Sequence, residues 1–119
     1  MSVEATVQQQ LDAYNRRDVE ALLAIYADDA QMFEHPAKLI ARGSADFRER
    51  FAARSREPNL HAQLLNRVVM GNIVIDHERV TRTFAHCPGS GALVMIYQVQ
   101  DDRICKAWML AGATTLDGE

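Results

Sequence analysis

The sequence lacks the features that mark secreted and membrane proteins. Its 119 residues include only two cysteines, Cys87 and Cys105, and residues 1–10 are too polar for a signal sequence. Disulfide frameworks belong to oxidising compartments, so we expect free thiols and a cytoplasmic location. The longest apolar runs reach only a few residues, whereas a helix needs ~20 to span a bilayer. The sequence therefore predicts no membrane segment.

Clustered positive charge is also missing. The chain has 13 Lys and Arg against 16 Asp and Glu, a formal net charge of −3 and a pI of about 5.8. A nucleic-acid-binding domain needs basic residues gathered on one face. The densest basic group is interleaved with acidic residues, as on a solvated helix face, and consists of Arg48, Arg50, Arg54 and Arg56. We expect no nucleic-acid partner.

The motifs of several enzyme classes are absent as well. The sequence contains no nucleophile elbow and no glycine-rich phosphate loop. The four histidines, at positions 35, 61, 77 and 86, lack the spacing of a metal site. We therefore predict neither a metal nor another cofactor.

What the chain does contain is typical of one folded domain. Its length is near that of a single domain, and its apolar fraction of 48% and charged fraction of 24% are ordinary for a globular protein. We expect residues 1–119 to form one domain, with a core that needs no disulfide.

The first half of the sequence predicts helices. Residues 3–16 carry apolar side chains at helical spacing, and Asp18 can cap a second helix over residues 19–27. Gly43 and an N-cap at Ser44 open a third helix, which runs to about Arg56. Two short extended segments lie between them, at residues 30–35, closed by Pro36, and at residues 38–42.

The second half predicts strands. Runs rich in branched apolar residues cover 60–70, 73–84, 92–100 and 104–111, with turn signals at residues 71–72, 87–91 and 101–103. We expect the tail from Thr114 to be frayed. Helices followed by a meander of strands define an α+β fold.

The segment from Tyr14 to Pro36, YNRRDVEALLAIYADDAQMFEHP, carries a family resemblance. Its helix, acidic break, second helix, short strand and proline resemble the nuclear transport factor 2-like superfamily, and within it the SnoaL-like group that includes ketosteroid isomerases. The resemblance covers nearly the whole chain. It implies a cone-shaped α+β barrel, with three N-terminal helices on a curved, mixed, mainly antiparallel sheet and a pocket between them. Members include isomerases, epoxide hydrolases, cyclases and proteins without catalysis, so the fold does not define the function.

The isomerases imply a base and two acidic hydrogen-bond donors. The base position falls on His35, or on Glu34 if the strand is shifted by one residue. The strand donor falls near Met95, which cannot donate, and the tyrosine donor falls near Gln10. The resemblance therefore does not predict a standard ketosteroid isomerase.

Three titratable residues are candidates for catalysis. His35 has the pKa range of a general base, but it is also compatible with a histidine at a strand end. Asp76 and Glu78 share one face of their strand, which the resemblance turns inward, and two close carboxylates favour acid–base chemistry. The other possibility is a polar outer face with arginine partners. The turn at residues 71–72 would bring Arg67 opposite Asp76, as an ion pair or an anion clamp.

The pocket is expected to receive a small apolar molecule. Its candidate lining is Tyr14, Phe33, Arg67, Met95, Tyr97 and Trp108, most of which are equally compatible with plain core. Trp108 could also lie on the outer face of the sheet, where we expect a homodimer contact. The sequence leaves open a cofactor-independent isomerase, cyclase or hydrolase, a ligand-binding protein and a dimerisation domain.

Overall fold

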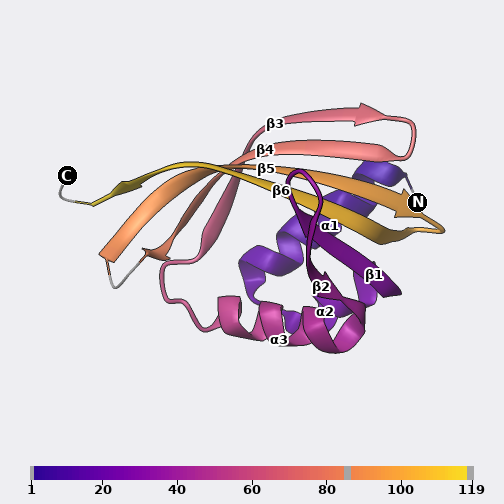
Figure 1. Cartoon of the computed structure of the whole chain (residues 1–119), viewed down its shortest axis with the longest axis horizontal. Helices are drawn as coiled ribbons and strands as arrows, with labels where there is room; N and C mark the ends of the chain where they lie inside the picture. Colours follow the sequence, from indigo (N-terminus) through magenta and orange to yellow (C-terminus); the bar gives the residue numbers. More distant parts are fainter. Residues whose placement is uncertain (1, 85–86, 118–119) are drawn as a thin grey trace.

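The computed structural model describes residues 2–84 and 87–117, in which three helices cover one face of a six-stranded sheet (Figure 1). Helix α1 (Val3–Arg16) begins at Ser2, whose hydroxyl accepts a hydrogen bond from the Ala5 N–H. Helix α2 (Val19–Ile25) is capped by Asp18, as predicted. It ends two residues before the predicted end, because residues 26–34 already belong to a strand.

Helix α3 (Gly43–Ser55) is capped differently from the prediction. Its N-cap is Arg42 rather than Ser44, and Gly43 has a φ of 79°. The carboxylate of Asp46 accepts a hydrogen bond from the Arg42 N–H at 2.9 Å. The Arg42 side chain makes no capping hydrogen bond, so the acidic side chain in the first turn satisfies only the N–H of the N-cap residue itself. A glycine suits the left-handed φ at the entry.

The sheet has the order β2-β1-β6-β5-β4-β3. Its strands are β1 (Tyr26–Glu34), β2 (Lys38–Arg42), β3 (His61–Met70), β4 (Ile73–Phe84), β5 (Cys87–Gln100) and β6 (Arg103–Leu116). Strands β1 and β6 are parallel and all other neighbours are antiparallel, which confirms a mixed, mainly antiparallel sheet. The sheet curves around the helices and stays open (Figure 1).

The last hairpin is longer than the sequence indicates. Residues 87–91, expected as a turn, form the start of β5, and Thr114 to Leu116 pair with them instead of fraying. A side chain at Gly89 would lie 2.6 Å from the carbonyl oxygen of Thr115, so a glycine is required for this close approach. Pairing between strands therefore overrides the turn propensity. His86, one of the four histidines, and residues 118–119 lie outside the described residues.

The core lies between the helices and the concave face of the sheet. Its largest cluster surrounds Tyr26, Phe47, Phe51 and Tyr97, and a second cluster joins Leu11 to Val80. Cys87 and Cys105 are free thiols, as predicted. Among the helices of residues 2–84 and 87–117, none is long and apolar enough to cross a membrane.

Strand β4 turns two carboxylates into this core. Val74, Asp76, Glu78 and Val80 are all buried, whereas His77 is exposed, so the inward parity implied by the resemblance is confirmed. Asp76 pairs in register with Arg67, again as predicted. The Arg67 guanidinium donates to both carboxylate oxygens, at 2.7 and 3.0 Å, and also to the Gln8 side chain at 2.9 Å. The Asp76 side chain is fully buried, which makes this a buried, bidentate ion pair.

Replacing Arg67 by Met should lower the free energy of unfolding by about 3–5 kcal/mol, because Asp76 would remain buried as a charge without its partner. Adding Asp76→Leu to that variant should restore most of the loss, since no buried charge is left. Chemical denaturation of the two variants measures both effects. A loss below about 1 kcal/mol in Arg67→Met would mean that the pair behaves as an exposed ion pair.

Candidate functional site

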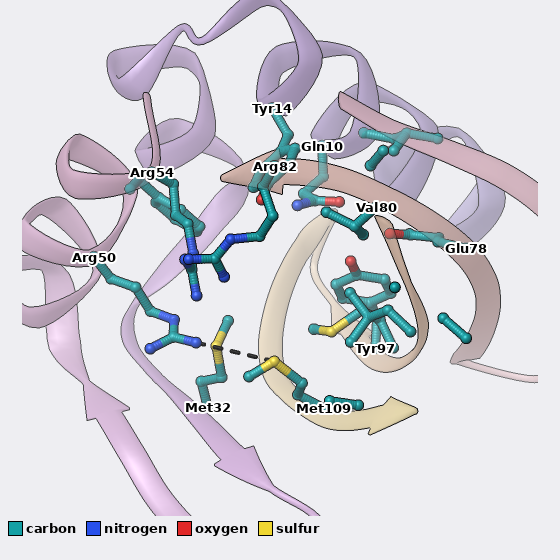
Figure 2. Close-up of a pocket in the computed structure, with 18 of the residues that line it drawn as sticks. Gln10, Tyr14, Met32, Arg50, Arg54, Glu78, Val80, Arg82, Tyr97 and Met109 are labelled. Carbon is teal, nitrogen blue, oxygen red and sulfur yellow. Dashed lines mark hydrogen bonds between the residues drawn. The ribbon is translucent and has the colours of Figure 1, made fainter. Parts of the chain in front are cut away.

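A cavity of about 160 Å³ lies between the helices and the concave face of the sheet (Figure 2). This volume is similar to that of an engineered cavity of roughly 150 Å³ that binds benzene, so the space holds at least one ring. Helices α1 and α3 line it with Gln10, Leu11, Tyr14, Arg50, Phe51 and Arg54. The strands contribute Tyr26, Met32, Ala62, Glu78, Val80, Arg82, Gly91, Ala92, Leu93, Met95, Tyr97, Met109, Ala111, Gly112 and Thr114.

The middle of the cavity is apolar because three neighbouring strands present aligned apolar residues there. Met95 pairs with Met109, and Leu93 pairs with both Glu78 and Ala111. Side chains that face the same side of paired strands lie beside one another. The surface beneath a bound molecule is therefore made mostly of thioether and aliphatic groups, which favours an apolar ligand.

Glu78 is the carboxyl group of this cavity. Its residue is 3% exposed, and its Oε2 has no hydrogen-bond partner among the described residues. The pKa of Glu78 is raised to about 7, mainly by burial and secondly by the negative charge of Asp76, while the positive charge of Arg67 acts to lower it. Asp76 differs because Arg67 satisfies both of its oxygens. The charge of Asp76 is thus compensated by Arg67, whereas Glu78 can exchange a proton near neutral pH.

Neutral hydrogen-bonding groups surround Glu78. Figure 2 shows the side chains of Gln10 and Glu78 pointing toward each other, and Gln10 Oε1 also lacks a partner among the described residues. Burial raises the pKa of Tyr14, Tyr26 and Tyr97, so these phenols stay protonated at neutral pH. The cavity therefore combines one titratable carboxyl with neutral phenol and amide groups.

Three arginines gather on the other side of the cavity (Figure 2). Arg50 and Arg54 lie one turn apart on α3, and Arg82 comes from β4. Glu57 accepts from Arg54 at 3.2 Å and from Arg82 at 2.9 Å. Among the described residues, Arg50 has a single hydrogen-bond contact, a long one of 4.0 Å to the Met109 sulfur.

The structure brings four of the sequence-predicted site residues to this cavity: Glu78, Tyr14, Met95 and Tyr97. Asp76 and Arg67 lie beside it, as the ion pair next to Glu78. The catalytic roles of Asp76 and Glu78 remain predictions.

Three other candidates lie outside the cavity lining. His35 is exposed in the turn after β1, where its backbone N–H donates to the Met109 carbonyl at 2.8 Å, and Glu34 is also exposed. Phe33 stacks on Trp108 with ring centroids 5.8 Å apart. These two residues alternate with the buried Met32 and Ala107, so they face the opposite side of the sheet. The base position implied by the resemblance thus falls outside this pocket.

Several lining residues were not foreseen, chief among them Arg50, Arg54, Arg82 and Tyr26. The sequence assigned the two helix arginines to a solvated face, and the structure corrects this. A signal was available, because Phe47 and Phe51 mark the buried face and Arg50 and Arg54 each follow one of them by three residues. Within residues 2–84 and 87–117, no group of three His, Cys, Asp or Glu residues is placed to hold a metal ion.

Comparison with known proteins gives the family. Residues 7–107 match the SnoaL-like domain, so the chain belongs to the SnoaL-like family of the nuclear transport factor 2-like superfamily. No curated protein matches the chain in sequence.

Solved structures show the same fold. A protein of cystatin fold from Novosphingobium aromaticivorans is 24% identical, with a TM-score of 0.83 over 92% of this chain and 97% of that one. IdmH, a proposed polyketide cyclase from Streptomyces antibioticus, is 18% identical, with a TM-score of 0.79 over 93% and 92%. An epoxide hydrolase from M. tuberculosis is 15% identical, with a TM-score of 0.79 over 92% and 81%. At these identities the likeness defines the fold alone.

The raised pKa of Glu78 predicts a pH-dependent cost to stability. The folded state holds this proton more tightly than the unfolded chain, so the cost is absent below pH 4.5 and complete above about pH 7. A shift from 4.5 to about 7 corresponds to about 3 kcal/mol. The free energy of unfolding of Glu78→Gln should therefore rise relative to the wild type across this window.

Denaturant titrations at several pH values measure this difference. Glu49→Gln, an identical change at an exposed position on α3, should show no such trend. A flat difference for Glu78→Gln would mean that Glu78 titrates as an exposed carboxyl.

Proposed function

We propose that this protein is a cofactor-independent acid–base enzyme that moves a proton on a small apolar substrate, with Glu78 as the group that takes and returns it. The observation that carries the proposal is a buried carboxyl whose Oε2 has no hydrogen-bond partner among the described residues, with a pKa of about 7, in a largely apolar cavity of about 160 Å³. A general base works best when its pKa is near the operating pH.

The chemistry follows from this arrangement. The Glu78 carboxylate removes a proton from a carbon next to a carbonyl, so a C–H bond breaks and an O–H bond forms on Glu78. The electron pair moves onto the carbonyl oxygen to give an enolate. Protonated phenols near Glu78 favour that charge. In an isomerisation, the same proton then returns from Glu78 to another carbon of the conjugated enolate. In a ring closure, the enolate carbon attacks a second carbonyl of the substrate, and the alkoxide that forms takes the proton back from Glu78.

Isomerase or cyclase chemistry is favoured over hydrolysis by the surroundings of Glu78. A hydrolase must also hold and orient a water molecule, whereas the strand neighbours of Glu78 that line the cavity, Leu93 and Val80, are apolar. Proton transfer within a substrate requires only the base and an acceptor for the charge.

Nitrobenzisoxazole, a neutral compound of two fused rings that releases a coloured phenolate when a base removes its isoxazole ring proton, tests the proposal. The wild type should open this ring with a rate that rises through about pH 7 and then levels, because the carboxylate is the active form. Glu78→Gln should lower kcat/KM at least about 100-fold, the usual contribution of a positioned base. Glu49→Gln should retain the wild-type rate.

His35→Ala tests the base position implied by the family resemblance. Activity that disappears in His35→Ala but survives in Glu78→Gln would assign the base to His35 and overturn the proposal. Absence of turnover in the wild type, with the probe bound in the cavity, would favour a ligand-binding protein instead.

We also propose that the outer face of the sheet forms a homodimer. Stacked Phe33 and Trp108 lie on this face, and the neighbouring Leu110 is 48% exposed. Apolar residues gathered on an exposed face favour association.

Replacing Leu110 by Lys should convert the dimer to a monomer without unfolding it, because the side chain is already half exposed. Sedimentation velocity, with circular dichroism as the check on folding, measures this. A wild type that sediments as a monomer at every concentration would contradict the proposed dimer.

A further inference from the structure

Arg50 is a cation in the cavity without an acidic partner. Its polar contact, to the Met109 sulfur at 4.0 Å, is to a weak acceptor. Its acidic neighbours on α3, Asp46 and Glu49, form no ion pair with it, and neither does any other described residue. Figure 2 shows its side chain directed into the cavity from α3. A partly buried guanidinium normally has its charge compensated, so we expect a ligand to supply the negative charge that Arg50 lacks.

The charged residues around Arg50 also favour a negatively charged ligand. Three arginines line this side of the cavity, and the nearby carboxylate, Glu57, accepts from Arg54 and Arg82. Glu57 forms no ion pair with Arg50, so no carboxylate of the described residues compensates the charge of this third guanidinium. Burial, followed by repulsion from Arg54, lowers the pKa of Arg50. An anion between these guanidinium groups would relieve both effects, whereas a neutral ligand would relieve neither.

The opposite side of the cavity does not attract an anion. Glu78 lies there, four residues from Arg82 along β4, which corresponds to about 13 Å at the rise of a strand. Between the two lie Val80, Leu93 and the methionines of the neighbouring strands. The cavity is thus positive on one side, apolar in the middle and proton-accepting on the other side (Figure 2).

We propose that the ligand of this cavity is an apolar carboxylic acid, whose carboxylate binds Arg50 and whose ring or chain extends across the apolar floor toward Glu78. A guanidinium presents two parallel N–H donors to a carboxylate, which gives a directional contact as well as charge compensation. The inference deepens the proposed function, since the reacting carbon is then the part of the acid that reaches Glu78. Binding of the acid, however, does not require catalysis.

Naphthaleneacetate and its neutral amide, naphthaleneacetamide, test the proposal because they share the ring system and have head groups of similar shape, of which only the carboxylate is charged. Titration calorimetry with the wild type should give at least about tenfold tighter binding of the acid, the effect of one charge-assisted hydrogen bond of roughly 1.5 kcal/mol. Arg50→Met should abolish this preference while still binding the amide. Equal affinities of the acid and the amide in the wild type would overturn the proposal, whatever the variants do.

Two controls separate this proposal from others. Arg56→Met makes the same change in net charge at an exposed position after α3 and should keep the preference. If Arg56→Met loses it as fully as Arg50→Met, the preference comes from overall charge and Arg50 is not the binding group. Tighter binding of naphthyl phosphate than of naphthaleneacetate would define a phosphate site and overturn the carboxylate assignment.

Glu78→Gln distinguishes the ligand from the reaction. This variant should still prefer the acid, because Arg50 is intact, although it loses turnover of nitrobenzisoxazole. An acid preference without wild-type turnover would refute the proposed reaction and leave the ligand class standing. Turnover without an acid preference would refute the proposed ligand class and leave the proposed reaction standing.

Discussion

The ion pair between Arg67 and Asp76 determines the character of the cavity. Strand β4 turns two carboxyls toward the helices, and one guanidinium satisfies both oxygens of Asp76. Glu78 is left beside a buried negative charge, with apolar neighbours and no cation of its own. A buried ion pair contributes little to stability compared with well-packed apolar residues. Its effect here is that Asp76 is paired, so that Glu78 is left as the carboxyl that can take and release a proton.

This arrangement differs from the one that the family resemblance implies. The isomerase pattern puts a base before the proline that follows the first strand, but in this chain His35 and Glu34 are exposed there. The carboxyl of the cavity comes instead from β4, on the far side of β5 and β6. A shared fold supplies the cavity, while side chains from different strands supply its chemistry.

Local signals in the sequence were sufficient for most of the fold. The cap at Asp18 and the alternation along residues 73–84 both correspond to the structure, because each depends on neighbours in the chain. The inward direction of Asp76 and Glu78 came from the alternation together with the family resemblance. The extension of β5 back to Cys87 could not be predicted, since it depends on pairing with β4 and β6 across the sheet. The site was harder to predict for the same reason. Periodicity places Arg50 and Arg54 on one face of α3, but it does not show what that face covers.

The parallel pairing of β1 with β6 has a consequence for how the chain folds. Residues 26–34 find one of their two sheet neighbours only in residues 104–109, although helix α3 between them can form from local contacts. The first strand therefore cannot join the main sheet until residues 104–109 have left the ribosome. Such distant pairing slows folding and exposes an unpaired strand edge in the meantime. In this domain, the strand that is synthesised first can join the main sheet only after the sixth strand has been made.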